Sequence, residues 1–189
     1  DPIKNNEFVK RKLSSDGGIL WIGNRENLHS IEPLLESQEA FGGRAIYIAS
    51  NFLKNDPVKT LYKNIHFIDW ELDISYKTEI INASFMVLNH IADVDTYSKY
   101  KSENKMVTAI ASGLIPIVSA SPAYSELAGR LEASRIVFNS LDEVPGILDG
   151  LEDDWMNSFS FRAKDYIADH YSHENIFNNL RTLVLENKK

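Results

Sequence analysis

The 189-residue chain contains no cysteine, and this absence excludes three kinds of chemistry. Without a thiol there is no disulfide, no thiolate zinc site and no cysteine nucleophile. No apolar run approaches the roughly eighteen residues that a membrane-spanning helix needs, and the first twelve residues lack the apolar core of a signal peptide. We therefore expect a soluble, cytoplasmic domain without a transmembrane segment.

Basic charge and the common catalytic motifs are also scarce. The chain has 20 Lys and Arg against 27 Asp and Glu, a formal net charge of −7. Binding to a phosphate backbone needs a basic surface, so nucleic acid is not an expected partner. The sequence holds no GxxxxGK[ST], GxSxG or HExxH. These gaps disfavour P-loop enzymes, α/β-hydrolases and zinc proteases.

Glycine is missing where a dinucleotide site would need it. The turn after the first apolar run reads GNRENL, with one glycine where the NAD fingerprint requires three. The second apolar run ends in Ala-Ser-Asn, without the acidic residue that binds the NAD ribose. We expect no cofactor, and an unrelated Rossmann-like reductase or epimerase is disfavoured for the same reason.

Short apolar runs alternate with helical patterns along most of the chain. Several runs are apolar on both faces, which is typical of parallel strands buried between two layers of helices. We therefore predict a doubly wound, Rossmann-like α/β fold whose six parallel strands have the order 3-2-1-4-5-6. The predicted strands are residues 19–23, 45–50, 65–70, 85–90, 115–119 and 135–138.

The helical patterns lie between these strands and again after the last one. They cover residues 30–41, 76–82, 103–112, 123–132 and 141–151, with a weaker signal after Asp56-Pro57. Two more helices are predicted over 155–170 and 173–187. No linker divides the chain, so we expect one domain over residues 1–189, with a lead-in over 1–18 and C-terminal helices over 155–189.

Ligands of doubly wound sheets bind outside the carboxyl ends of the strands where the strand order reverses, here between the first and fourth strands. Gly23, Asn24 and Arg25 follow the first strand, and Asn89 follows the fourth. These four residues are therefore candidates for a binding site. The alternative for Arg25 is an ordinary exposed surface arginine.

The segment Lys101-Ser102-Glu103-Asn104-Lys105 opens the next predicted helix at the same crevice. Ser102 has the chemistry of an N-cap, and the amides that follow it, the helix dipole and the two lysines would favour an anion. This pattern indicates a phosphate site. The alternative is that Ser102 only caps the helix and that both lysines are solvated.

Two groups of potential metal ligands have simpler roles as alternatives. His170, His173 and Glu174 have helical spacing but are more simply a polar helix junction, and residues 93–95 (DVD) are more simply a loop. We therefore expect no metal site.

Residues 101–127, KSENKMVTAIASGLIPIVSASPAYSEL, resemble the nucleotide-binding segment of GT-B glycosyltransferases. Residues 19–36, ILWIGNRENLHSIEPLLE, resemble the first strand and helix of the carboxy-terminal domain in that family, and IHFIDW lies between the two segments. The resemblance implies a domain that binds a nucleoside-diphosphate sugar as substrate. It also implies that a separate N-terminal domain holds the acceptor. Because the chain has one such unit and begins with Asp, we expect a fragment that is inactive alone.

The resemblance also implies roles for single residues. Gly23, Asn24 and Arg25 would line the pyrophosphate. Asp69 and Trp70 would flank the base. The phosphates would be held by Ser102, Asn104 and Lys105.

Thr108 falls where many retaining members carry a glutamate that binds the ribose. The two acids of the family's E-x7-E pair are replaced by Tyr100 and Thr108. A non-catalytic domain that binds a nucleotide or a partner therefore stays open as an alternative.

Overall fold

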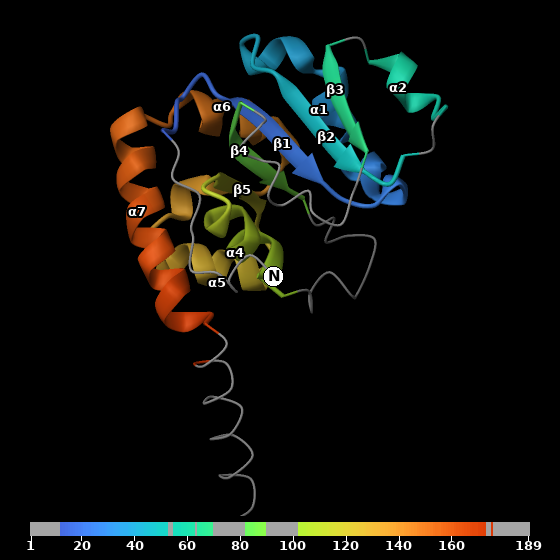
Figure 1. Cartoon of the computed structure of the whole chain (residues 1–189). Coiled ribbons are helices and arrows are strands. Elements are labelled where there is room, and N and C mark those ends of the chain that lie inside the picture. Colours follow the sequence, from blue (N-terminus) through green and yellow to red (C-terminus); the bar gives the residue numbers. More distant parts are fainter. Residues whose placement is uncertain are drawn as a thin grey trace, which may run out of the picture.

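Parallel strands form one open sheet in the computed structural model, which describes residues 12–52, 55–62, 64–69, 82–89, 102–172 and 175. Within these residues the sheet has six strands in the order β3-β2-β1-β4-β5-β6 (Figure 1). They are β1 (Gly18–Ile22), β2 (Ile46–Ser50), β3 (Ile65–Asp69), β4 (Ala83–Leu88), β5 (Ile115–Ser119) and β6 (Val137–Phe138). Every pairing is parallel, so the predicted fold class and strand order are confirmed.

The central strands are buried on both faces, which is why their sequences do not alternate. All six residues of β4 and all five of β5 are buried. The edge strand β3 is instead exposed along part of its length. Continuous burial of this kind requires helices on both sides of the sheet.

Pro116 lies inside β5, a position that would normally disrupt a sheet because proline has no N–H to donate. It pairs with Met86 of β4, whereas β6 pairs only with Val118 and Ser119. The part of β5 that contains Pro116 is therefore a sheet edge on the β6 side. The proline is tolerated because no strand is paired with it there.

Right-handed crossovers place helices on both faces of the sheet. One face carries α4 (Asn104–Ala111), α5 (Pro122–Arg130) and α7 (Asp153–His170), and the other carries α1 (Glu32–Glu36) and α2 (Val58–Leu61) (Figure 1). The remaining α-helix of the described residues, α6 (Val144–Asp149), follows β6 and the 3₁₀ turn Leu141–Glu143.

The predicted helix over residues 30–41 is wrong as a single element. It is divided into a 3₁₀ helix (Arg25–Ile31), the short α1 and a second 3₁₀ helix (Gln38–Phe41). The buried residues Leu28 and Ile31 of the first 3₁₀ helix lie three positions apart. That spacing fits the three residues per turn of a 3₁₀ helix better than the 3.6 of an α-helix.

Other differences are small. The last predicted strand shortens to Val137–Phe138 because residues Ser134–Ile136 form a 3₁₀ turn. Of the helices predicted over 76–82 and 173–187, only residues 82 and 175 are described.

The long helix α7 packs along α4 through one apolar stripe. Met156, Phe159, Ala163 and Ile167 are buried at intervals of three and four residues. Burying a side chain such as Phe159 stabilises the fold by about 1.5–3 kcal/mol.

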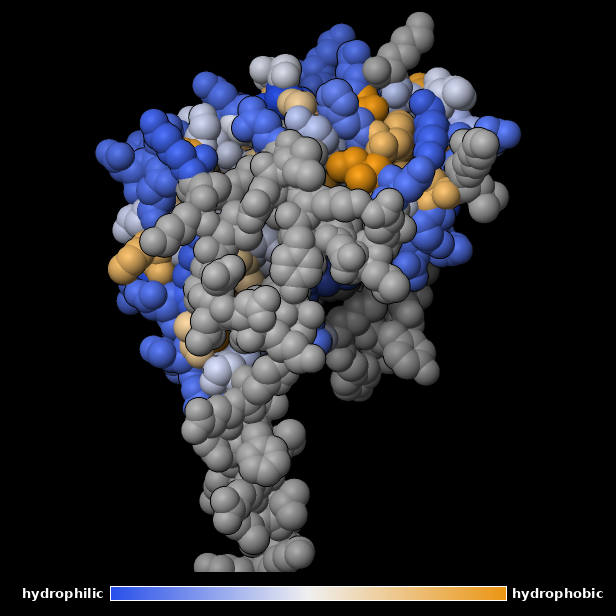
Figure 2. Space-filling view, in the orientation of Figure 1, coloured by the Kyte–Doolittle hydropathy of each residue, from blue (hydrophilic) through white to orange (hydrophobic). Residues whose placement is uncertain are grey.

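Among the described residues, no helix combines the length and the hydrophobicity that a membrane span requires. The described surface seen in Figure 2 is mostly hydrophilic, with few apolar side chains.

Gly18 marks the closest approach of β1 to its two neighbours. A Cβ at this position would lie 2.8 Å from the carbonyl oxygen of Asn82 and 2.9 Å from that of Ala45. Strand backbones cannot move apart without losing hydrogen bonds, so Gly18→Ala is expected to lower the free energy of unfolding by about 1–3 kcal/mol. Urea unfolding followed by circular dichroism measures the change.

Gly129→Ala is the matched control for this substitution. A Cβ at Gly129 would meet no atom within 4 Å outside the backbone of its own helix. Alanine is the better helix former, so the free energy of unfolding should stay unchanged or rise by up to about 1 kcal/mol. Equal losses in both variants would contradict the close approach at Gly18.

Candidate functional site

The carboxyl ends of β1 and β4 and the beginning of α4 meet at one edge of the sheet. Lys105 Nζ donates to the carbonyl oxygen of Ile22, the last residue of β1, over 3.3 Å. Since Ile22 directly precedes Gly23, this contact places the beginning of α4 beside the first loop. The sequence predicted this meeting at the switch point of the sheet.

The amino terminus of α4 differs in detail from the prediction. The helix begins at Asn104 and its N-cap position is Glu103, so the prediction that Ser102 is the N-cap is wrong. The Glu103 side chain makes no capping hydrogen bond, and the first backbone bond of the helix runs from the Val107 amide to the Glu103 carbonyl. The first turn of any helix presents backbone amides at its amino terminus, and here these belong to residues 104–106.

The amino terminus of a helix favours an anion, because its amides and the helix dipole are oriented toward it. Ser102, Asn104 and Lys105 are all exposed at this end of α4. The residues present can therefore hold a phosphate group.

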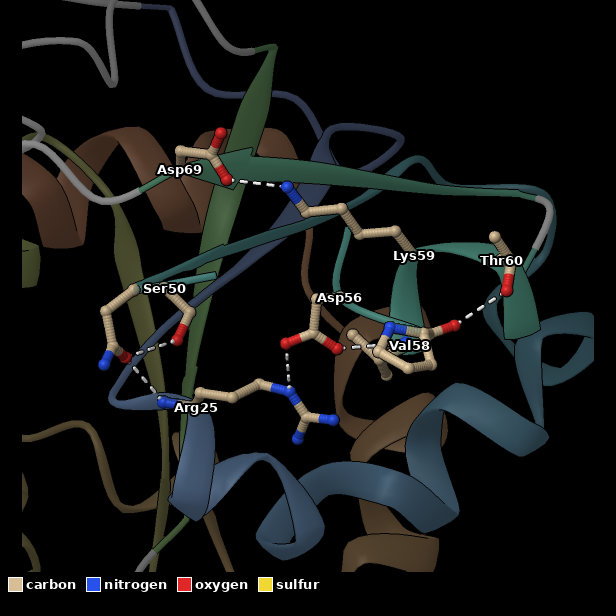
Figure 3. Close-up of polar contacts among 9 residues, drawn as sticks. Arg25, Ser50, Asp56, Val58, Lys59, Thr60 and Asp69 are labelled. Atoms are coloured by element: carbon tan, nitrogen blue, oxygen red, sulfur yellow. Dashed lines mark hydrogen bonds and ion pairs between the residues drawn. The ribbon is translucent and has the colours of Figure 1, made fainter. Parts of the chain in front are cut away.

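Arg25 is anchored at the same edge of the sheet (Figure 3). Its backbone amide donates to Asn51 Oδ1 over 2.8 Å, and its Nε donates to Asp56 Oδ2 over 2.9 Å. The Asp56 side chain is only 6% exposed, whereas that of Arg25 is 36% exposed. The buried carboxylate therefore fixes one edge of the guanidinium while part of this group still faces solvent.

Asp56 joins the loop after β2 to the loop after β1. The hydrogen bond from Arg25 holds the pKa of the Asp56 carboxyl below its ordinary value; the Val58 amide and the charge of Lys59 act in the same direction, and burial opposes them. Asp56 is therefore charged at neutral pH and stabilises both loops.

Asp69, predicted to flank a base, lies at the end of β3 and forms an ion pair with Lys59 (Figure 3). Lys59 Nζ lies 2.7 Å from Asp69 Oδ1 and 5.2 Å from the centre of the Phe52 ring. Trp70 lies outside the described residues, so its predicted place beside the base is not described.

Asn89 and Gly23 have structural roles that the sequence did not reveal. Asn89 Nδ2 donates to the carbonyl oxygen of Ser30 over 2.7 Å, so it joins the end of β4 to the first 3₁₀ helix. A Cβ at Gly23 would lie 2.5 Å from the indole ring of Trp21. Gly23 is therefore needed for the packing of Trp21, whatever else it contacts.

Thr108 and Asn24 complete the predicted set. The Thr108 hydroxyl donates to the Asn104 carbonyl oxygen of its own helix over 2.9 Å, a common contact of threonine inside helices. Asn24 is exposed in the first loop. Both stay predictions as ligand contacts.

The sequence missed the polar partners of the predicted residues. Asp56 and Asn51 hold Arg25, and Tyr171 binds Glu103. In the sequence, Asp56-Pro57 indicated only the start of a helix and not the contact with Arg25. Nothing in a single sequence indicates that residues 31 or 68 positions apart form a hydrogen bond.

Metal ligands do not gather in the described part of the chain. No group of three His, Asp or Glu side chains there could hold a metal ion. The ring nitrogen Nδ1 of His170 lies 2.9 Å from the Tyr166 carbonyl oxygen. His173, Glu174 and residues 93–95 lie outside the described residues.

A separate hollow of about 720 Å³ lies at the opposite edge of the sheet, where β2 and β3 begin. Its lining includes Glu39, Arg44 and His66. Because ligands of this fold bind at the carboxyl ends of the strands, the hollow is not part of the predicted site.

Three solved structures share the fold of this chain. A mutant of the Thermobaculum terrenum O-GlcNAc transferase matches with a TM-score of 0.63 and 11% identity, over 89% of this chain and 34% of that one. TarM matches with a TM-score of 0.63 and 12% identity, over 95% and 37%. WaaG, a glycosyltransferase involved in lipopolysaccharide biosynthesis, matches with 0.57 and 12% identity, over 83% and 44%.

These matches establish the fold. The chain has the fold of one domain of the GT-B glycosyltransferases, as the sequence resemblance implied. It spans between 34% and 44% of the length of these three proteins. No protein-family model and no curated protein matches the sequence.

The ion pair of Arg25 with Asp56 makes stability depend on pH. Asp56→Asn is expected to lower the free energy of unfolding at pH 7 by about 1–2 kcal/mol, because a charge-assisted hydrogen bond is lost at a half-exposed arginine. The Asp56 pKa is lowered in the folded protein. Its stabilisation is therefore present above the ordinary aspartate pKa of about 4 and is lost as pH falls through the lowered value.

Urea unfolding of both proteins between about pH 7 and pH 3 should show the difference narrowing at the acidic end. Asp69→Asn is the control, because its carboxylate is 64% exposed and an exposed ion pair contributes at most about 1 kcal/mol. A constant difference at all pH values for Asp56→Asn would contradict the role of its charge.

Proposed function

We propose that this chain is the donor-binding domain of a GT-B glycosyltransferase and that it binds the diphosphate of a nucleotide sugar between β1 and α4. The contact of Lys105 with the Ile22 carbonyl carries the proposal, because it joins a basic side chain and the start of a helix at the switch point. The shared fold of the three transferases supports it.

The proposed chemistry is electrostatic. When a sugar leaves its nucleoside diphosphate, negative charge grows on the diphosphate oxygens, and fixed positive groups lower the barrier. The helix amides, Lys105 and Arg25 supply such groups in this proposal. Asp56 holds the Arg25 guanidinium in place, so little reorganisation is needed when the charge develops.

The other substrate needs a further domain in this proposal. The chain matches only part of each solved transferase, and we infer that the acceptor binds to a second, N-terminal domain of the same protein. Transfer then takes place in the cleft between the domains, where both reacting groups are held in position. Without the second domain, these 189 residues should bind the donor but not transfer it.

One observation favours a second candidate, a non-catalytic nucleotide-binding domain. The Thr108 hydroxyl bonds to its own helix, at a position where the resemblance implies an acid that binds ribose. Both candidates predict binding of a nucleoside diphosphate. Only the first predicts sugar transfer once the acceptor domain is present.

Lys105→Ala tests the proposed diphosphate site. Calorimetric titration of the parent with UDP, GDP, ADP and dTDP first identifies the nucleoside diphosphate that binds. The variant should then bind it roughly ten- to hundredfold more weakly, because a hydrogen bond to a charged group contributes about 1.5–3 kcal/mol. Binding of the corresponding nucleoside should barely change.

Arg162→Ala is the control for the loss of one positive charge, because Arg162 pairs with Glu132 on another part of the surface. Its affinities should equal those of the parent. A parent that binds no member of the panel, or a Lys105 variant with unchanged diphosphate affinity, would overturn the proposed site.

A further inference from the structure

The end of α7 is hydrogen-bonded to the beginning of α4. Tyr171, the C-cap residue of α7, donates its hydroxyl to Glu103 Oε1 over 2.8 Å, and Glu103 is the N-cap residue of α4. These residues lie 68 positions apart in the sequence. The contact therefore connects α7 to the proposed diphosphate site.

Glu103 and Lys105 extend from different sides of α4. Residues two positions apart on a helix do not face each other. The Glu103 carboxylate reaches α7, whereas Lys105 Nζ reaches the end of β1. The Glu103 carboxylate and the Lys105 ammonium group are thus held apart, because each is bonded to a different element.

The tyrosines around the carboxylate report its position. Burial raises the pKa of Tyr171, and the hydrogen bond to Glu103 raises it further. Burial also raises the pKa of Tyr124 on α5, and the Glu103 charge adds to this effect. The Glu103 carboxylate is therefore bonded to the hydroxyl of Tyr171 and lies near enough to Tyr124 for its charge to act there.

A carboxylate at an N-cap position can also adopt a second orientation. It can turn toward the first amides of its own helix, which attract negative charge. There it would occupy the groups that a phosphate needs and would repel the phosphate. In this structure Glu103 makes no such capping bond.

We propose that Tyr171 is a positioning residue that keeps the start of α4 open to the diphosphate by holding the Glu103 carboxylate against α7. This inference rests on the proposed function and adds a control element to its site. The affinity for the donor then depends on the position of Tyr171 at the end of α7. A change that moves Tyr171 releases a competing negative charge at the diphosphate site.

Removing the Tyr171 hydroxyl tests this role. Tyr171→Phe should weaken binding of the nucleoside diphosphate roughly three- to tenfold, because the released carboxylate competes for the helix amides. Affinity for the bare nucleoside should not change. A second substitution, Glu103→Gln, removes the competing charge and should restore the affinity of the Tyr171→Phe variant to that of the parent.

Tyr166→Phe is the matched control, one turn and a half earlier on α7. The Tyr166 ring stacks on that of His170, and its hydroxyl acts on Arg130, so its loss should leave both affinities unchanged. A merely structural role for Tyr171 would weaken nucleoside and diphosphate alike, and Glu103→Gln would not rescue it. Either of these results, or an unchanged diphosphate affinity in Tyr171→Phe, overturns the inference.

Inorganic pyrophosphate separates this inference from the proposed function. If the parent binds pyrophosphate but no nucleoside diphosphate, the donor proposal fails, and the same variants titrated with pyrophosphate still decide the role of Tyr171. If the parent binds neither ligand, both proposals are overturned.

Discussion

The pairing of β1 with β4 at the centre of the sheet is the constraint on which the rest of the structure depends. These two strands begin the two halves of the fold, and the chain leaves them in opposite directions. Their carboxyl ends therefore lie together while the helices that follow cover opposite faces. The loop after β1 and the start of α4 must then meet, and the Lys105 contact with Ile22 is the result.

Polar contacts between distant segments give this edge of the sheet its shape. The buried Asp56 carboxylate holds Arg25, and the Asn89 amide joins β4 to the first 3₁₀ helix. Tyr171 holds Glu103 from the far end of the chain. Each contact fixes a loop whose backbone lies outside the strand ladder. The core supplies the stability, whereas these contacts set the geometry of the candidate site.

The charges at the site are arranged by these same contacts. Asp56 and Glu103 are acidic residues close to the two basic residues proposed to bind a diphosphate. Asp56 contacts Arg25 directly and orients it. Glu103 is held on the α7 side of α4, away from the face that carries Lys105. The two carboxylates therefore have different roles in the proposed site. Asp56 orients the Arg25 guanidinium, whereas Glu103 is held where it does not compete with the diphosphate for the helix amides.

The sequence alone determined the sheet and its strand order, because burial on both faces leaves an unbroken apolar pattern and right-handed crossovers allow few topologies. The edge where a ligand binds stays a prediction. Helix caps and short helical turns were predicted less accurately. Ser102 was predicted to be the cap, but the helix begins one residue later, and residues Arg25–Ile31 form a 3₁₀ helix that was not predicted. Only the tertiary structure decided the partners of Arg25, Asn89 and Glu103. A hydrogen bond between residues far apart in sequence depends on three-dimensional proximity, which leaves no periodic signal in the chain.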